Sequence, residues 1–210
     1  MSSAFRNDAR TPNGAVKVAV VRRSVPLDRA RATLRDALLR HVSVDAREER
    51  HQKAIVRLVE TETACFSRHT FAPGHITGSA FVVCRSTGKV LLHHHRRLNA
   101  WLQLGGHDDG EYDPRATALR EAAEESGLKD LTLLKDEILD VDVHYIPAGK
   151  GEPPHLHYDV RYALATATPG DIHRDAAESV DLRWFTLGEA AERMNEPGGR
   201  RALARVAKLL

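Results

Sequence analysis

The sequence has few residues of the kinds that define disulfide-rich, zinc-stapled or membrane-spanning proteins. Only two cysteines occur, Cys65 and Cys84, which excludes a disulfide framework and a zinc site built from paired cysteines. No apolar run approaches the roughly 18 residues that a membrane span needs. The start of the sequence also lacks the apolar core of a secretory signal. We therefore expect a cytoplasmic protein without a membrane partner.

An excess of charge of one sign is also missing, since 31 basic residues face 29 acidic ones. There is no basic stripe, and aromatic residues make up only 5% of the chain, so we expect no nucleic-acid partner. The charge is nevertheless unevenly distributed, with 12 acidic and 4 basic residues between His107 and Asp142. This asymmetry fits an acidic metal-binding segment, but composition alone favours the alternative, a solvated helix with its loops.

The length of 210 residues, 42% of them hydrophobic, predicts one domain with an appendage. Apolar residues at helical spacing predict one helix over residues 26–41 and a second from Asp45 toward Cys65. Asp45 and Glu48 resemble a capping box at the start of the second helix. We assign residues 1–68 to a tail with a helical extension and residues 69–210 to the main domain. Residues 1–23 have no sustained period and indicate either a loose tail or a strand without an evident partner.

After Pro73-Gly74 the pattern changes to short, β-rich runs. Two hairpins are predicted, the first from residues 80–84 and 90–94, the second from residues 138–146 and 155–165. The remaining predicted elements are strands at 101–104 and 182–185 and helices at 114–126, 187–194 and 200–210. This mixture predicts an α+β fold.

The segment with the clearest chemistry is the helix that Asp113-Pro114 begins and Gly127 ends. Glu121 and Glu125 are four residues apart and share a face, and Glu124 lies on its flank. Like charges at this spacing destabilise a helix, and a hard divalent ion such as Mg²⁺ or Mn²⁺ would relieve the repulsion with its preference for oxygen ligands. The alternative is an ordinary exposed, glutamate-rich helix face.

The wider pattern favours the metal hypothesis, because it resembles the signature box of the Nudix hydrolases, G-x5-E-x7-R-E-U-x-E-E-x-G-U, with U an apolar residue. The residues that match its fixed positions are Gly106, Arg120, Glu121, Glu124, Glu125 and Gly127, with Ala122 and Leu128 at the two apolar positions. The resemblance implies a Nudix-type αβα sandwich with a mixed β-sheet, to which the helical extension is added at the N-terminus.

The resemblance also implies roles for individual residues. Glu121 and Glu125 would be the principal ligands of Mg²⁺ or Mn²⁺, and Glu124 would bind a further ion or polarise water. The backbone carbonyl of Gly105 would complete the metal site, and Arg120 would orient the glutamates. All these positions fall within one strand, loop and helix.

A further carboxylate outside the box often acts as base or metal ligand in the Nudix family, and Glu178 is our candidate for that catalytic role. It stands six residues before Trp184, just ahead of a predicted strand; the alternative is an exposed loop glutamate. By resemblance, the protein would be a Mg²⁺-dependent pyrophosphohydrolase that cleaves a diphosphate linkage in a nucleoside diphosphate-linked compound.

Two residues depart from the box. Tyr112 stands where the box has its first glutamate, which mainly supports the box arginine, and Leu104 stands where proline commonly precedes the glycines. Glu111 or Asp113 are the residues that could reach Arg120 instead. The displaced glutamate is the one argument for the alternative function, a catalytically weak or inactive Nudix-like nucleotide-binding module.

Polar residues alternate with apolar ones along the second hairpin, at residues 140–144 and 155–161. This polar face would either position a substrate or face water. His93, His94 and His95 resemble a metal cluster, but successive strand residues point to opposite faces and cannot all bind one ion. Arg96 and Arg97 follow directly, and contact with a substrate phosphate is one alternative for them.

The apolar stripe of the N-terminal helices must also be covered. We expect the helices to dock on the same chain, where they could form a roof over the substrate cleft. The alternative is that the stripe is covered by a second subunit in a homodimer.

Overall fold

The computed structural model describes residues 25–149 and 151–210, and in these it has five helices and one eight-stranded mixed sheet. The helices are α1 (Leu27–Arg40), α2 (Ala46–Thr61), α3 (Pro114–Ser126), α4 (Leu187–Arg193) and α5 (Pro197–Val206). The strands are β1 (His75–Cys84), β2 (Lys89–His95), β3 (Ala100–Leu102), β4 (Leu104–His107), β5 (Thr132–Leu133), β6 (Asp140–Ile146), β7 (His155–Thr166) and β8 (Ser179–Phe185). The predicted α+β fold with N-terminal helices is confirmed. The predicted tail or strand at residues 1–23 lies outside the described residues.

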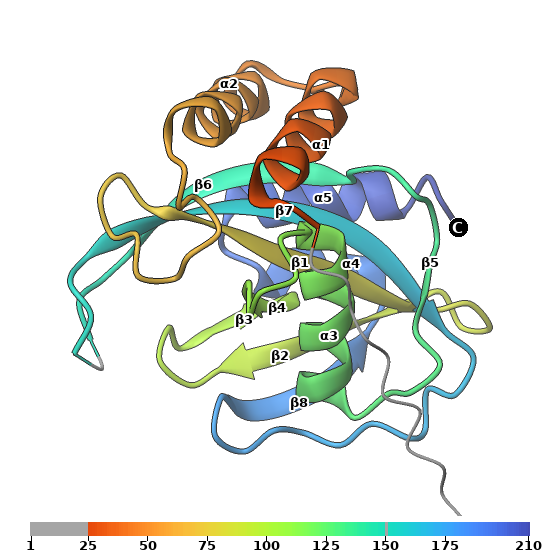
Figure 1. The fold of residues 1–210 in the computed structure, drawn as a ribbon. Coiled ribbons are helices and arrows are strands. Elements are labelled where there is room, and N and C mark those ends of the chain that lie inside the picture. Colours follow the sequence, from red (N-terminus) through yellow and green to blue (C-terminus); the bar gives the residue numbers. More distant parts are fainter. Residues whose placement is uncertain (1–24, 150) are drawn as a thin grey trace, which may run out of the picture.

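Two long parallel strands, β1 and β7, form the centre of the sheet (Figure 1). They pair in register from His75 opposite His157 to Cys84 opposite Thr166. The other edge of β1 is shared, because β4 pairs with residues 77–80 and β2 with residues 82–84. The two predicted hairpins are present as β1–β2 and β6–β7. Residues paired in this way point to the same face of the sheet, so the register decides which distant side chains meet.

Each face of the sheet has its own apolar core. The core under α1, α2 and α3 takes the even-numbered positions of β1 and β7, such as Ile76 and Val160. The core under α4 and α5 takes odd-numbered positions in the second half of β1, such as Phe81 and Val83. In the first half of β1 the odd-numbered positions are polar, and this is where the cleft described below opens. No helix within the described residues is long and apolar enough to cross a membrane.

The N-terminal helices dock on their own chain, which is the first of the two arrangements that we expected. Leu38 of α1 and Ile55 of α2 are fully buried in the core that α3 shares, and Figure 1 shows both helices over β6 and β7. Arg205 connects α5 to this helical pair, because its guanidinium donates to the carboxylate of Glu48 at 2.7 Å and to the carbonyl of Val42 at 2.8 Å. Neither helix lines the cleft, so the expected roof over the substrate is wrong.

The predicted capping box at the start of α2 is half formed. The side chain of Asp45 accepts a hydrogen bond from the backbone N–H of Glu48 at 2.8 Å. The Glu48 carboxylate does not return to Asp45; it is completely buried and contacts His41 at 2.7 Å and Arg205. Glu48 therefore joins α2 to α5 rather than closing its own helix end.

Some element boundaries differ from the sequence prediction. The single strand expected at residues 101–104 is two strands, because the chain changes partner at Gln103, from β2 to β1. Helix α5 begins three residues earlier than expected, since Glu196 accepts hydrogen bonds from the N–H groups of Gly198 and Gly199, both at 2.7 Å. The two-residue strand β5 is too short for periodicity to reveal.

Candidate active site

Helix α3 positions the predicted catalytic residues against the sheet. The Asp113 carboxylate caps its start by accepting from the N–H of Arg115 at 3.0 Å, and Pro114 occupies its first turn. At the other end Gly127 adopts a left-handed conformation, with φ 74°, that glycine tolerates best. Between these ends α3 packs on β1 and β4. Its glutamate-bearing face is thereby directed at the Gly105-Gly106 segment of β4.

Glu125 is the most buried of the predicted metal ligands, with 3% of its surface exposed. One carboxylate oxygen, Oε2, accepts from the backbone N–H of Gly105 at 2.8 Å. The other, Oε1, is buried without a hydrogen-bond partner and lies 3.5 Å from Nδ1 of His93. Burial, together with the neighbouring Glu121 and Glu178 charges, raises the pKa of Glu125 to about 8. An unpaired buried carboxylate oxygen is costly to keep, and a bound cation would remove that cost.

Glu121 lies directly against β4. A Cβ at Gly106 would be only 2.5 Å from the Glu121 carboxylate, so a larger residue there would displace this carboxylate. Burial raises the pKa of Glu121 in spite of its ion pair with Arg120, whose Nη1 lies 2.9 Å from the carboxylate. Glu124 is exposed and pairs with the same Nη1 at 3.0 Å.

Arg120 is the centre of this charge network. Its Nε donates to Glu111 at 2.8 Å and its Nη2 to the carbonyl of His107 at 2.7 Å. Burial alone would lower the pKa of the guanidinium, but its carboxylate partners, Glu111 first, raise it. Arg120 thus holds Glu121 and Glu124 on one side and the loop before α3 on the other.

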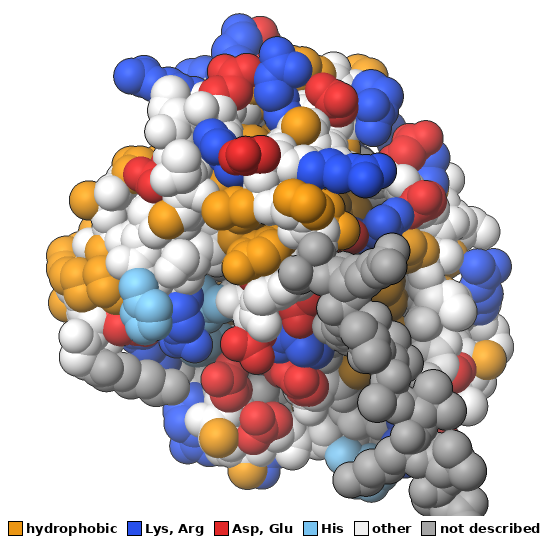
Figure 2. All heavy atoms as spheres, viewed as in Figure 1, with side chains coloured by type: hydrophobic (Ala, Val, Ile, Leu, Met, Phe, Trp, Pro, Cys, Tyr) orange, Lys and Arg blue, Asp and Glu red, His pale blue; other side chains and the backbone are white. Residues whose placement is uncertain are grey.

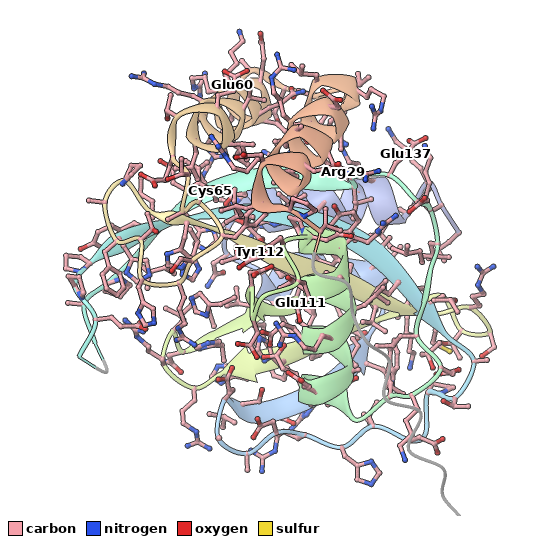
Figure 3. All side chains as sticks on the ribbon, in the orientation of Figure 1. Arg29, Glu60, Cys65, Glu111, Tyr112 and Glu137 are labelled. Atoms are coloured by element: carbon pink, nitrogen blue, oxygen red, sulfur yellow. The ribbon has the colours of Figure 1, made fainter. Side chains whose placement is uncertain are left out.

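The residue at the first box glutamate, Tyr112, makes no contact of this kind. Its backbone is in the left-handed region, with φ 53°, and its ring packs 5.8 Å from that of Phe66. Figure 3 shows Glu111 beside α3 and Tyr112 nearer to α1. Asp113, the other residue considered as a partner for Arg120, is engaged by the N–H and guanidinium of Arg115. Glu111 is therefore the residue that replaces the missing glutamate.

We expect Glu111→Ala to lower kcat/KM by roughly 10–100-fold, the usual cost of removing a residue that supports a metal site. Glu111→Gln should lose less, because the amide oxygen still accepts from Arg120. Tyr112→Glu should bring no gain, since Arg120 is already paired. Steady-state kinetics at saturating metal measure all three, and a Glu111→Ala enzyme of wild-type rate would contradict the assignment.

The carboxylates border a cleft of about 420 Å³, a size suited to a small molecule. Glu121 and Glu178 line it, together with four arginines, Arg68, Arg96, Arg97 and Arg120. Acidic and basic side chains are also gathered around α3 on the face shown in Figure 2. A cleft that joins carboxylates to arginines is suited to a metal ion and the phosphates it would bind.

Glu178 is an exposed residue of the loop before β8, and the structure brings it close to the carboxylates of α3. Its charge contributes to the raised pKa values of both Glu121 and Glu125. The loop is held by a hydrogen bond of 2.8 Å from the N–H of Arg96 to the carbonyl of Glu178. Glu178 therefore lies near the glutamates of α3, and its role as base or ligand stays a prediction.

Sequence reasoning missed the part that His93 plays. As expected for a strand, the three consecutive histidines do not converge: His94 packs on Trp101, whereas His93 points inward to Ser179 and Glu125. His93 is 2% exposed and supports the buried side of Glu125. The contact between His93 and Glu125 depends on the tertiary structure, because β2 pairs with β8 and lies beside β4.

The polar face of the second hairpin proves to be a buried ion network. Arg161 lies between Asp140 at 3.2 Å, Asp142 at 3.3 Å and Asp159 at 2.9 Å, and all four are at most 2% exposed. Arg201 of α5 adds a second guanidinium, 2.6 Å from Asp140. Of these residues, Asp159 also lines the cleft. Most of this face is therefore a buried ion network rather than a surface that faces water. His144, His157 and Asp159 are the residues of it that line the cleft.

Comparison with known proteins identifies the family. The family model described as NUDIX domain matches residues 74–206, more than half of the chain. The chain belongs to the Nudix family. As a Nudix hydrolase it acts on phosphoric anhydride bonds, and its family generally uses divalent metal ions. No curated protein matches the chain significantly.

Solved structures share the Nudix fold. The dihydroneopterin triphosphate pyrophosphohydrolase of E. coli is 20% identical, with a TM-score of 0.50, covering 62% of this chain and 92% of that one. A NUDIX family hydrolase from Clostridium perfringens is 26% identical, with a TM-score of 0.46 and coverages of 69% and 99%. An Ap4A hydrolase of C. elegans is 19% identical, with a TM-score of 0.49 and coverages of 63% and 95%.

Proposed function

We propose that this Nudix hydrolase is a Mg²⁺-dependent (or Mn²⁺-dependent) pyrophosphohydrolase that cleaves the diphosphate linkage of a nucleoside diphosphate-linked compound. The observation that supports the proposal most strongly is the buried Oε1 of Glu125, which has no hydrogen-bond partner within a cluster of three glutamates. Carboxylate oxygens are the ligands that Mg²⁺ and Mn²⁺ prefer. The donor set therefore fits the metal ion.

In this mechanism Glu121 and Glu125 would hold the metal ion, and the Gly105 carbonyl and Glu124 would be further ligands. A divalent ion supplies charge neutralisation of the diphosphate and lowers the pKa of bound water. Arg120 keeps Glu121 and Glu124 in place through its two ion pairs. Each glutamate must be ionised to bind, so the metal ion competes with the proton that burial favours on Glu125.

We assign Glu178 to deprotonation of the attacking water or to a further ligand position. It is the remaining carboxylate whose charge acts on both Glu121 and Glu125, and it faces the same cleft. Arg96 and Arg97 also line the cleft and would bind the phosphates of the substrate. Arg97 is placed by its hydrogen bond to the carbonyl of Pro147.

The alternative of an inactive nucleotide-binding module is not favoured. Its one argument was the displaced first glutamate, and Glu111 takes over the contact with Arg120 at 2.8 Å. A module without catalysis would gain nothing from a cluster of like-charged carboxylates on one helix.

A substrate panel tests the proposed function. The purified protein is incubated with ADP-ribose, Ap4A, CoA and nucleoside triphosphates, with Mg²⁺ or Mn²⁺, and products are identified by ³¹P NMR. We expect at least one compound to yield two phosphate-bearing fragments, and EDTA to abolish the reaction. Turnover that survives EDTA would contradict the metal requirement, and no turnover of any diphosphate with either ion would favour the binding module.

A further inference from the structure

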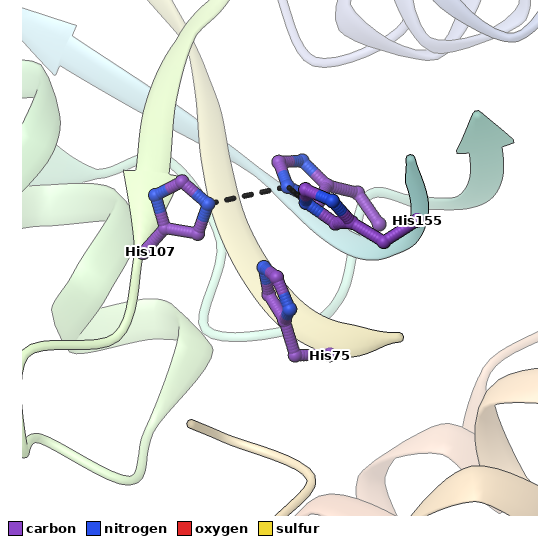
Figure 4. Close-up of side chains that lie close together, drawn as sticks. His75, His107 and His155 are labelled. Carbon is purple, nitrogen blue, oxygen red and sulfur yellow. Dashed lines mark hydrogen bonds between the residues drawn. The ribbon is translucent and has the colours of Figure 1, made fainter. Parts of the chain in front are cut away.

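Four histidines converge beside the cleft, and two of them, His107 and His157, line it. The four are His75 on β1, His107 on β4, and His155 and His157 on β7. The sheet register explains their meeting, because His75 pairs directly with His157, and Thr77, two residues further along β1, pairs with His107. His155 shares a face with His157, from which it is two residues away. Figure 4 shows the rings of His75, His107 and His155 turned toward a common space.

The separations between the ring nitrogens are those of ligands around one ion. All four histidines offer a ring nitrogen within 4.8 Å of the others. Nε2 of His157 lies 3.2 Å from Nε2 of His107 and 3.2 Å from Nε2 of His155. Two nitrogens bound tetrahedrally to zinc at about 2.0–2.1 Å would be about 3.3–3.4 Å apart. The cluster therefore needs little movement to close around an ion.

The outer nitrogens of two of these rings are already held by backbone carbonyls. Nδ1 of His75 is 3.1 Å from the carbonyl of Thr70, and Nδ1 of His155 is 2.8 Å from that of Pro153. A carbonyl only accepts, so each Nδ1 carries the proton and each Nε2 keeps its lone pair. This is the arrangement that orients metal-ligating histidines.

Without an ion these lone pairs are poorly satisfied. His75 is fully buried, and its Nε2 has no hydrogen-bond partner. Nε2 of His157 carries at most one proton when the ring is neutral, although it faces two other ring nitrogens. Burial lowers the pKa of His75 to about 4 and that of His107 to about 3, so both rings are neutral at pH 7. Neutral imidazole is the form that binds metal.

We propose that His75, His107, His155 and His157 form a second metal site that binds one transition-metal ion of the zinc type. Imidazole nitrogens suit Zn²⁺, Ni²⁺, Cu²⁺ and Fe²⁺, whereas Mg²⁺ prefers oxygen. This site differs in ligand chemistry from the carboxylate site, and it stands independently of the proposed reaction. Its ligands come from three strands, so a bound ion would cross-link β1, β4 and β7.

The histidine cluster is also connected to the residues of the carboxylate site, through His107 and Arg120. His107 follows Gly105 and Gly106 on β4, and its carbonyl accepts from Arg120 at 2.7 Å. His107 and His157 line the cleft, whereas His75 and His155 lie buried behind them. A bound ion would fix the strand against which Glu121 and Glu125 pack.

Metal titration of the full-length, metal-free protein tests the proposal. Zn²⁺ is added in the presence of millimolar Mg²⁺, which occupies the carboxylate site, and binding is followed by calorimetry and by the rise in Tm. We expect one tightly bound Zn²⁺ per chain. His155→Gln and His157→Gln should each weaken it by at least about 100-fold, because loss of a ligand exceeds the roughly 10–100-fold cost of losing an outer partner. His173→Gln, which changes an exposed histidine, should leave the Zn²⁺ affinity unchanged.

Co²⁺ provides a readout that does not need a variant. Visible d–d absorption of the wild-type protein with Mg²⁺ present should be that of tetrahedral nitrogen ligands, and it should disappear in whichever of His155→Gln and His157→Gln folds. Glu125→Gln should keep both the Zn²⁺ and the Co²⁺ signal, which separates this site from the catalytic one. Equal Zn²⁺ affinity in the wild type and in both histidine variants, or no Zn²⁺ binding and no tetrahedral Co²⁺ spectrum, would overturn the proposal.

Discussion

Glu125→Gln is expected to lower kcat by about 10³-fold or more, a loss of roughly 4 kcal/mol of transition-state stabilisation. The amide keeps the volume of the side chain and its acceptor for the Gly105 N–H, but it removes the negative charge that would neutralise the metal ion. Glu121→Gln should behave similarly. The fold should be retained, because burial already disfavours the charged form of both side chains.

A matched control is available in Glu137, which lies outside the cleft on the surface and pairs with Lys135. Glu137→Gln should leave kcat unchanged within experimental error. Rates are compared at saturating metal and substrate, with circular dichroism and Tm as checks of folding. A Glu125→Gln enzyme that retains a near wild-type rate would remove this glutamate from the metal site.

Leu38→Ala should lower the free energy of unfolding by about 2–5 kcal/mol, whereas Leu39→Ala should change it by no more than about 0.5 kcal/mol. These adjacent leucines of α1 differ in one respect: Leu38 is 0% exposed and Leu39 is 56% exposed. Truncating Leu38 opens a cavity in the core that α1 and α2 share with α3 and the sheet. Urea denaturation of the three proteins measures the difference.

Removal of residues 1–68 should destabilise the fold more than Leu38→Ala does. It deletes several buried apolar side chains from one face of the sheet, namely Leu34, Leu38, Ile55, Leu58 and Val59. We expect the remaining chain to aggregate. By contrast, full-length Leu38→Ala below its melting temperature should keep its KM, because neither helix lines the cleft. A soluble truncated protein of unchanged stability would show that the extension is dispensable.

The helix that carries the candidate site, α3, could be derived from the sequence because its geometry is local. Spacing of four residues puts Glu121 and Glu125 on one face of any α-helix, and the N-cap at Asp113 and the left-handed Gly127 fix its ends. The same holds for the hairpins and the N-terminal helices, whose hydrophobic period is visible in short windows. The division into β3 and β4 at Gln103 is not visible in such a window, because it depends on a change of partner strand from β2 to β1.

The identity of the partner of Arg120 needed the tertiary structure. The sequence left Glu111 and Asp113 open, because both are near enough along the chain. The backbone at Tyr112 turns through a positive φ and packs the tyrosine ring against Phe66, which leaves Glu111 facing Arg120. That turn depends on packing between the loop and the residues after α2, which no local pattern contains.

The sequence by itself thus determined the carboxylate-bearing helix and the family it resembles, since both depend on short-range spacing. The tertiary structure alone decided which distant residues complete the sites. His75 and His157 stand far apart in the sequence, and they meet only because β1 and β7 pair in parallel in one particular register. A shift of one residue would turn every side chain of β7 to the opposite face, so the four-histidine cluster exists only in the packed sheet.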